Sequence, residues 1–60
     1  QSPADGYVEE ELAELYLATG RPEDARLHAA EAVELLGADS WFTEYESGRW
    51  ERLRRIAQMD

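Results

Sequence analysis

The stretch that decides the fold is residues 9–37, which read EEELAELYLATGRPEDARLHAAEAVELLG. A turn at Gly20, Arg21 and Pro22 divides it into two segments, and each segment has apolar residues three or four positions apart. That spacing is typical of amphipathic helices. Glycine suits the end of one helix and proline the first turn of the next, so the sequence predicts two helices joined by a short turn. Helices joined in this way lie antiparallel.

The ends of this hairpin can also be predicted. The first helix should begin after Asp5, because a short acidic side chain can cap amide groups that have no partner inside the helix. The second helix should stop at Gly37, and its inner stripe consists mostly of alanines, which let two helix backbones approach closely. We therefore expect a buried hairpin interface formed by Leu12, Tyr16, Ala25, Ala32 and Leu36.

The last third of the chain, residues 40–60, continues the helical pattern. Asp39 and Ser40 offer a second cap, and apolar residues recur at helical spacing from Trp41 to about Met59. Ser47 and Gly48 interrupt the pattern, and a glycine costs about 1 kcal/mol inside a helix. We expect either one kinked helix or a short helix followed by a longer one, with Leu53 and Ile56 covering the hairpin. No segment shows a strand pattern, so the expected fold class is all-α.

Composition limits the class of protein. A chain of 60 residues makes one domain and buries only about 60% of its unfolded surface. It has no cysteine, so neither a disulfide nor a cysteine-based zinc site can reinforce it. No apolar run approaches the roughly 20 residues that cross a bilayer, and no signal peptide is recognisable, so we expect a cytoplasmic protein. We interpret residues 1–5 as a linker or expression remnant, and the chain as a fragment of a longer protein.

Charge is distributed unevenly. The formal net charge is −8, with twelve acids against Arg21 and Arg26 before residue 49, and four arginines against two acids from there on. An acidic body argues against binding to a phosphate backbone, which needs a basic patch. It favours a basic protein or peptide partner, or serves only solubility.

The hairpin resembles a tetratricopeptide repeat over residues 6–39. The pattern of that family has a large residue, Leu, a small residue and Tyr on the first helix, a glycine at the turn, and small residues on the second helix. Three positions depart from it, since Glu9, Ala29 and Gly37 stand where tryptophan, an aromatic residue and proline are frequent. Residues 40–60 do not repeat the pattern, and the resemblance implies that they form a terminal capping helix. The positions of the pattern correspond here to Glu9, Leu12, Ala13, Tyr16, Gly20, Ala25, Ala29 and Ala32.

The resemblance also implies a binding surface, because the inner groove of such repeats is lined by one face of the first helix. Glu10 and Glu14 stand four residues apart there, where like charges repel by a few tenths of a kcal/mol, and this cost favours a functional reason for keeping both. The alternative is a solvated face whose acids suit the positive end of the helix. The groove positions correspond here to Tyr7, Glu10, Glu11, Glu14 and Leu17.

Two functions of different kinds follow. The first is a protein–protein interaction or scaffold module whose acidic groove binds a peptide or a partner helix. The second is structural, namely the C-terminal cap of a repeat array or a self-associating homo-oligomer. In the second case the side of the first helix around Val8 and Leu15 would lack its normal neighbour.

The arginines of the last segment invite another interpretation. Arginines beside aromatic residues could form a nucleic-acid or membrane-surface helix. We favour a simpler role, in which the arginines neutralise the acidic hairpin, Glu51 pairs with Arg55, and the aromatic residues are mostly core. An exposed tryptophan would instead mark a contact surface. The residues concerned are Arg49, Arg52, Arg54 and Arg55 with Trp41, Phe42 and Trp50.

No catalytic constellation can be assembled. His28 is the single histidine, and the serines Ser2, Ser40 and Ser47 fall in the leader or at helix caps. Neither a nucleophilic triad nor a metal site can be built from these groups. We expect His28 to be a surface or half-buried packing residue, and we expect no enzyme activity, no metal and no cofactor.

Overall fold

The computed structural model describes residues 5–59, and this part of the chain is all-α with no strand. The expected fold class is thereby confirmed. Residues 1–4, which we assigned to a linker, lie outside the described residues, as does Asp60. The helices are α1 (Gly6–Ala18), α2 (Pro22–Leu36), α3 (Ser40–Tyr45) and α4 (Ser47–Ala57).

Local signals set the ends of α1 and α2, as the sequence predicted. The side chain of Asp5 accepts a hydrogen bond from the Tyr7 amide at 2.9 Å and so caps α1. Gly20 turns the chain with φ at 76°, in the left-handed region that glycine enters without strain. Pro22 then starts α2, and Gly37 follows its last residue. These groups explain why two helices rather than one form here.

The segment after the hairpin divides into a short helix and a longer one, which confirms the second of the two expected alternatives. Asp39 caps α3 by accepting hydrogen bonds from the amides of Trp41 and Phe42 at 3.0 and 3.4 Å. Glu46 separates α3 from α4, because its backbone leaves the helical region at φ −118° and ψ 44°. No side chain caps α4, although the sequence had suggested Ser47 for that role.

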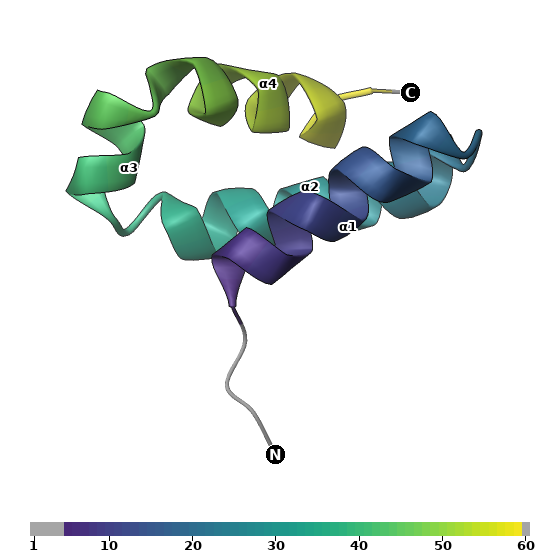
Figure 1. Cartoon of the computed structure of the whole chain (residues 1–60), viewed down its shortest axis with the longest axis horizontal. Helices are drawn as coiled ribbons and strands as arrows, with labels where there is room; N and C mark the ends of the chain where they lie inside the picture. Colours follow the sequence, from purple (N-terminus) through teal and green to yellow (C-terminus); the bar gives the residue numbers. More distant parts are fainter. Residues whose placement is uncertain (1–4, 60) are drawn as a thin grey trace.

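α1 and α2 form a hairpin, and α4, which we call the strap, covers it (Figure 1). α1 and α2 lie side by side, α3 turns the chain at the far end of α2, and α4 runs back across the hairpin. α4 packs mainly on α2 and touches α1 much less. Arg26 of α2 also donates a hydrogen bond to the carbonyl oxygen of Met59 at 3.2 Å, which holds the end of the strap in place.

A small core lies between these elements. Alanines of α1 and α2 are fully buried in it, and Phe42 and Leu53 are the largest side chains that are fully buried. The expected burial of the second-helix residues and of the two covering residues is confirmed. The buried apolar residues are Ala13, Ala25, Ala29, Ala32, Leu36, Phe42, Leu53 and Ile56.

Two of the residues expected to be buried at the hairpin interface are only partly covered. Leu12 and Tyr16 are half-buried, and Ala13 is the residue of α1 that is fully buried against the core. Consecutive helix residues point about 100° apart. Since Ala13 faces the core, Leu12 is turned toward the outside of the hairpin, and Tyr16 packs along the edge of the core.

None of the helices that the structure describes has the length and apolar character needed to pass through a membrane.

Candidate interaction surfaces

Arg49 of α4 links the strap to α1. Its guanidinium group donates to both carboxylate oxygens of Glu10, with Nε 2.9 Å from Oε2 and a second, shorter bond from Nη2 to Oε1. The Glu10 side chain is only 11% exposed. Arg49 also reaches Glu46 at 3.3 Å and lies over the rings of Tyr7 and Phe42 at 5.7 and 5.1 Å. The hydrogen bonds that Arg49 donates to Glu10 raise the pKa of the guanidinium group, so this buried carboxylate has a permanent cation beside it.

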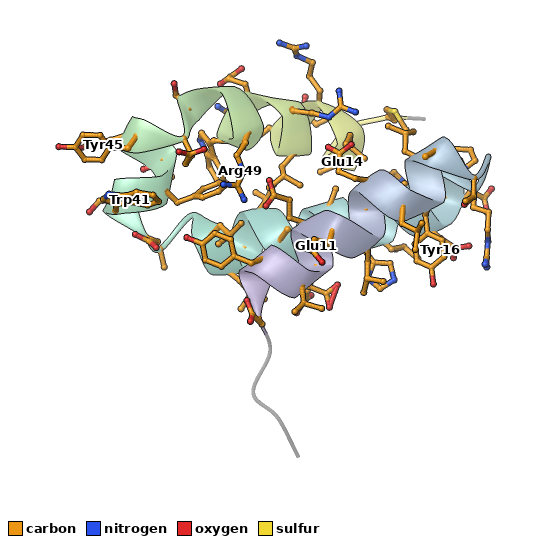
Figure 2. All side chains as sticks on the ribbon, in the orientation of Figure 1. Glu11, Glu14, Tyr16, Trp41, Tyr45 and Arg49 are labelled. Carbon is orange, nitrogen blue, oxygen red and sulfur yellow. The ribbon has the colours of Figure 1, made fainter. Side chains whose placement is uncertain are left out.

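A second ion pair joins the same two helices one turn further along. Arg52 binds both carboxylate oxygens of Glu14, with Nη2 2.7 Å from Oε1. Its hydrogen bond lowers the pKa of the Glu14 carboxyl group, although partial burial opposes that shift. Figure 2 shows Arg49 and Glu14 in the space between α4 and α1. Two acids of the predicted groove are therefore engaged by arginines of the same chain.

The other predicted groove residues lie in different surroundings. Tyr7 is exposed on one side, while its ring meets Phe42 edge-on at 5.7 Å. Leu17 is half-buried against the core. Glu11 is exposed, and residues 5–59 give it no ion-pair partner. Among the carboxylates of this face, Glu11 is thus the one open to an outside cation.

His28 has partners that the sequence did not reveal. Its Nδ1 lies 2.5 Å from Oε2 of Glu9, and its ring stacks on Tyr16 with centroids 5.2 Å apart. Both partners belong to α1, so the histidine connects the two helices of the hairpin. It is half-buried, as expected of a packing residue. Glu9 thus contributes to the contact between the two helices.

The outer face of α1 carries an apolar stripe. Val8 and Leu15 are 51% and 54% exposed, and Leu12 lies half-buried between them. Residues at i, i+4 and i+7 of a helix share one face. Since no part of residues 5–59 covers this face, the stripe is the part of α1 best suited to a helix-on-helix contact.

α3 carries two exposed aromatic residues that the sequence analysis did not separate from the core. Trp41 is 53% exposed and Tyr45 is 70% exposed, whereas Phe42 is fully buried. The signal was present in the spacing, because residues four apart share a helix face and Phe42 points about 100° away from Trp41.

One ion pair on α4 also differs from the prediction: Glu51 binds Arg54 at 3.1 Å, not Arg55.

No family model matches the chain, and comparisons with curated proteins and with solved structures find no similar protein. Within residues 5–59, no three histidine, aspartate or glutamate side chains are arranged so that they could hold a metal ion together.

Proposed function

We propose that this chain is a helical protein-interaction unit that packs the apolar stripe of α1, Val8, Leu12 and Leu15, against a helix of a neighbouring repeat or subunit. The observation that carries the proposal is the exposure of Val8 and Leu15 on one face of an otherwise amphipathic helix. This function corresponds to the structural role of an end unit in a helical-repeat array. The resemblance to a tetratricopeptide repeat supports it, because such units stack side by side to bury faces that a single unit leaves open.

The energetics of the stripe agree with a contact between helices. Burying a whole valine or leucine side chain contributes about 1.5–3 kcal/mol, and each of these two is already about half covered. Covering the rest would contribute roughly 1 kcal/mol for each side chain. That is enough to orient two helices within an array whose units are linked, and too little for tight binding by the isolated chain.

The isolated chain should therefore associate with itself through this face when it is concentrated. Sedimentation equilibrium over a series of loading concentrations measures this directly. We expect the parent to self-associate toward millimolar concentration, and a Val8→Gln, Leu15→Gln double variant to stay monomeric. Leu27→Gln is the matched control, because Leu27 is an exposed leucine on α2 outside the stripe. A parent that remains monomeric throughout would contradict the proposed contact face.

The acidic face of α1 is a second candidate, in which the groove binds a basic peptide. The observation in its favour is that this face holds two guanidinium groups, those of Arg49 and Arg52. A peptide would have to displace these internal arginines from Glu10 and Glu14, or use Glu11 alone. The affinity of such a peptide should fall as salt rises, and Glu11→Gln should weaken it. Unchanged affinity in that variant would remove the groove from consideration.

A further inference from the structure

The exposed aromatic pair on α3 has a defined geometry. The rings of Trp41 and Tyr45 lie with centroids 6.0 Å apart and planes 35° from parallel. Both side chains point away from the body of the molecule at its α3 end (Figure 2). Phe42, from the same helix, is the residue that is buried in the core. Tryptophan and tyrosine are the residue types most enriched where proteins bind one another.

The other aromatic rings of the chain each lie next to an arginine side chain. Arg49 lies over the rings of Tyr7 and Phe42, Arg21 lies over Tyr16 at 4.8 Å, and Arg54 lies over Trp50 at 5.9 Å. Four of the six aromatic side chains thus carry an arginine of this same chain. Within residues 5–59, Trp41 and Tyr45 are the two that carry none.

The charges near α3 explain why no arginine of this chain lies over Trp41 or Tyr45, and they favour a cation from outside. Between residues 27 and 48 the chain has five acids and no lysine or arginine. Two of these acids already have partners, since Asp39 caps α3 and Glu46 binds Arg49. Glu44 is exposed on α3, next to Tyr45 and three residues after Trp41. A carboxylate beside two electron-rich ring faces is a favourable environment for a cation.

We propose that Trp41, Glu44 and Tyr45 form a docking site for an arginine-bearing segment of a partner protein. The guanidinium plane stacks on the ring of Trp41 or Tyr45, and the Glu44 carboxylate supplies the counter-charge. A second copy of this chain fits the site less well. Two α3 helices brought together would add a second Glu44 to the contact and no arginine, because α3 has none.

The probe for this site is a blocked pentapeptide of three arginines alternating with two leucines, and the reference is the same peptide with glutamates. Two-dimensional nitrogen–proton NMR follows the indole N–H groups of Trp41 and Trp50 separately. We expect the arginine peptide to shift the Trp41 signal and to leave Trp50, which packs on Phe42, nearly unchanged. The glutamate peptide should shift neither. Equal shifts at both tryptophans would overturn the proposal.

Variants separate the aromatic contact from the general attraction of an acidic protein. Trp41→Ala should weaken binding about three- to fivefold, which is the size of an exposed cation–π contact, and Trp41→Phe should restore part of it. Glu44→Gln should weaken binding, whereas Glu23→Gln, which removes one charge at the other end of α2, should weaken it less. Equal loss in the two glutamine variants, or no loss in Trp41→Ala, would make the attraction non-specific.

The same experiment detects the other possible occupants. If Glu11→Gln weakens binding and Trp41→Ala does not, the peptide binds the acidic face of α1 and the α3 site is wrong. If the Trp41 signal moves with protein concentration in the absence of peptide, and Tyr45→Ala abolishes that movement, the occupant is a second copy and not an arginine segment.

Discussion

At the scale of single residues, two glycines in the second half of the chain differ in the space around them. A Cβ atom at Gly37 would lie 2.7 Å from the carbonyl oxygen of Val33 and 3.1 Å from the ring of Trp50. A Cβ atom at Gly48 would meet nothing within 4 Å, and Gly48 lies in the first turn of α4. The same substitution should therefore have opposite effects at the two positions.

Gly48→Ala should stabilise the protein by about 0.4–1 kcal/mol, because alanine has fewer conformations to lose on folding and fits the helix without strain. Gly37→Ala should destabilise it by roughly 1–3 kcal/mol, since the backbone and the indole ring must move apart. Urea unfolding followed by circular dichroism gives both values. A Gly37→Ala variant as stable as the parent would contradict the close approach of Trp50 to Gly37, and a destabilised Gly48→Ala variant would contradict the open space around Gly48.

At the scale of helices, the hairpin depends on the alanines of α2. Ala25 and Ala32 are fully buried in the core that α2 shares with α1 and α4. Replacing either by leucine should overpack this contact and cost roughly 1–3 kcal/mol. Ala30→Leu is the matched control, because Ala30 is exposed on the same helix and leucine is a good helix former there. Thermal melts that rank the control below the two core variants would exclude the proposed register of the hairpin.

The attachment of α4 to α1 gives a second prediction at this scale. Sequence spacing alone suggests that Glu10→Gln should relieve repulsion from Glu14 and be harmless. The structure reverses that expectation, because Glu10 is nearly buried and holds Arg49 through two hydrogen bonds. A buried group that loses a charged partner costs about 1–3 kcal/mol.

Glu10→Gln and Arg49→Lys should therefore both destabilise the fold, the second because lysine has no planar fork to bind both oxygens. Arg54→Lys is the control, since Arg54 pairs with Glu51 on the exposed side of the same helix. Chemical unfolding of the three variants tests the link. An Arg49→Lys variant as stable as Arg54→Lys would show that the two helices do not depend on it.

The helices illustrate which parts of the structure the sequence could predict. Caps, the turn glycine and the proline act within a few residues, so the ends of α1 and α2 followed from local chemistry. The link between Glu10 and Arg49 spans 39 residues. Which residues of α4 come to face Glu10 depends on the change of chain direction at Glu46. Nothing local specifies that angle. The site residues were therefore predicted as an open acidic face, whereas two of their carboxylates bind α4.

For the whole molecule, charge segregation is the organising feature. Most acids lie in the hairpin and α3, and most arginines lie on α4. Cross-helix pairs neutralise part of the acidic face, while the net charge of −8 remains as self-repulsion. Acidification acts on both: it lowers the repulsion between acids, and it removes the carboxylates that hold α4. The two effects have opposite signs, so a comparison between variants is needed to separate them.

Glu14 provides that comparison. The hydrogen bond from Arg52 lowers the pKa of the Glu14 carboxyl group in the folded state. A carboxylate of this kind stabilises the fold at every pH above its unfolded pKa of about 4.3, and the stabilisation is lost as the pH falls through the lower folded value. Glu14 and Arg52 are both more than a third exposed, so solvent screening limits the gain to a few tenths of a kcal/mol.

The free energy of unfolding of the parent should thus exceed that of Glu14→Gln by this small amount at neutral pH. The difference should shrink toward zero as the pH falls below the ordinary glutamate range, and it should also shrink in 1 M salt, where charges are screened within about 3 Å. Urea unfolding at several pH values measures it. Glu31→Gln removes one negative charge from the exposed side of α2 and so reports the change in repulsion alone. If the free energies of unfolding of the two variants depend on pH in the same way, relief of repulsion explains the whole pH dependence. The ion pair between Glu14 and Arg52 then adds nothing to stability.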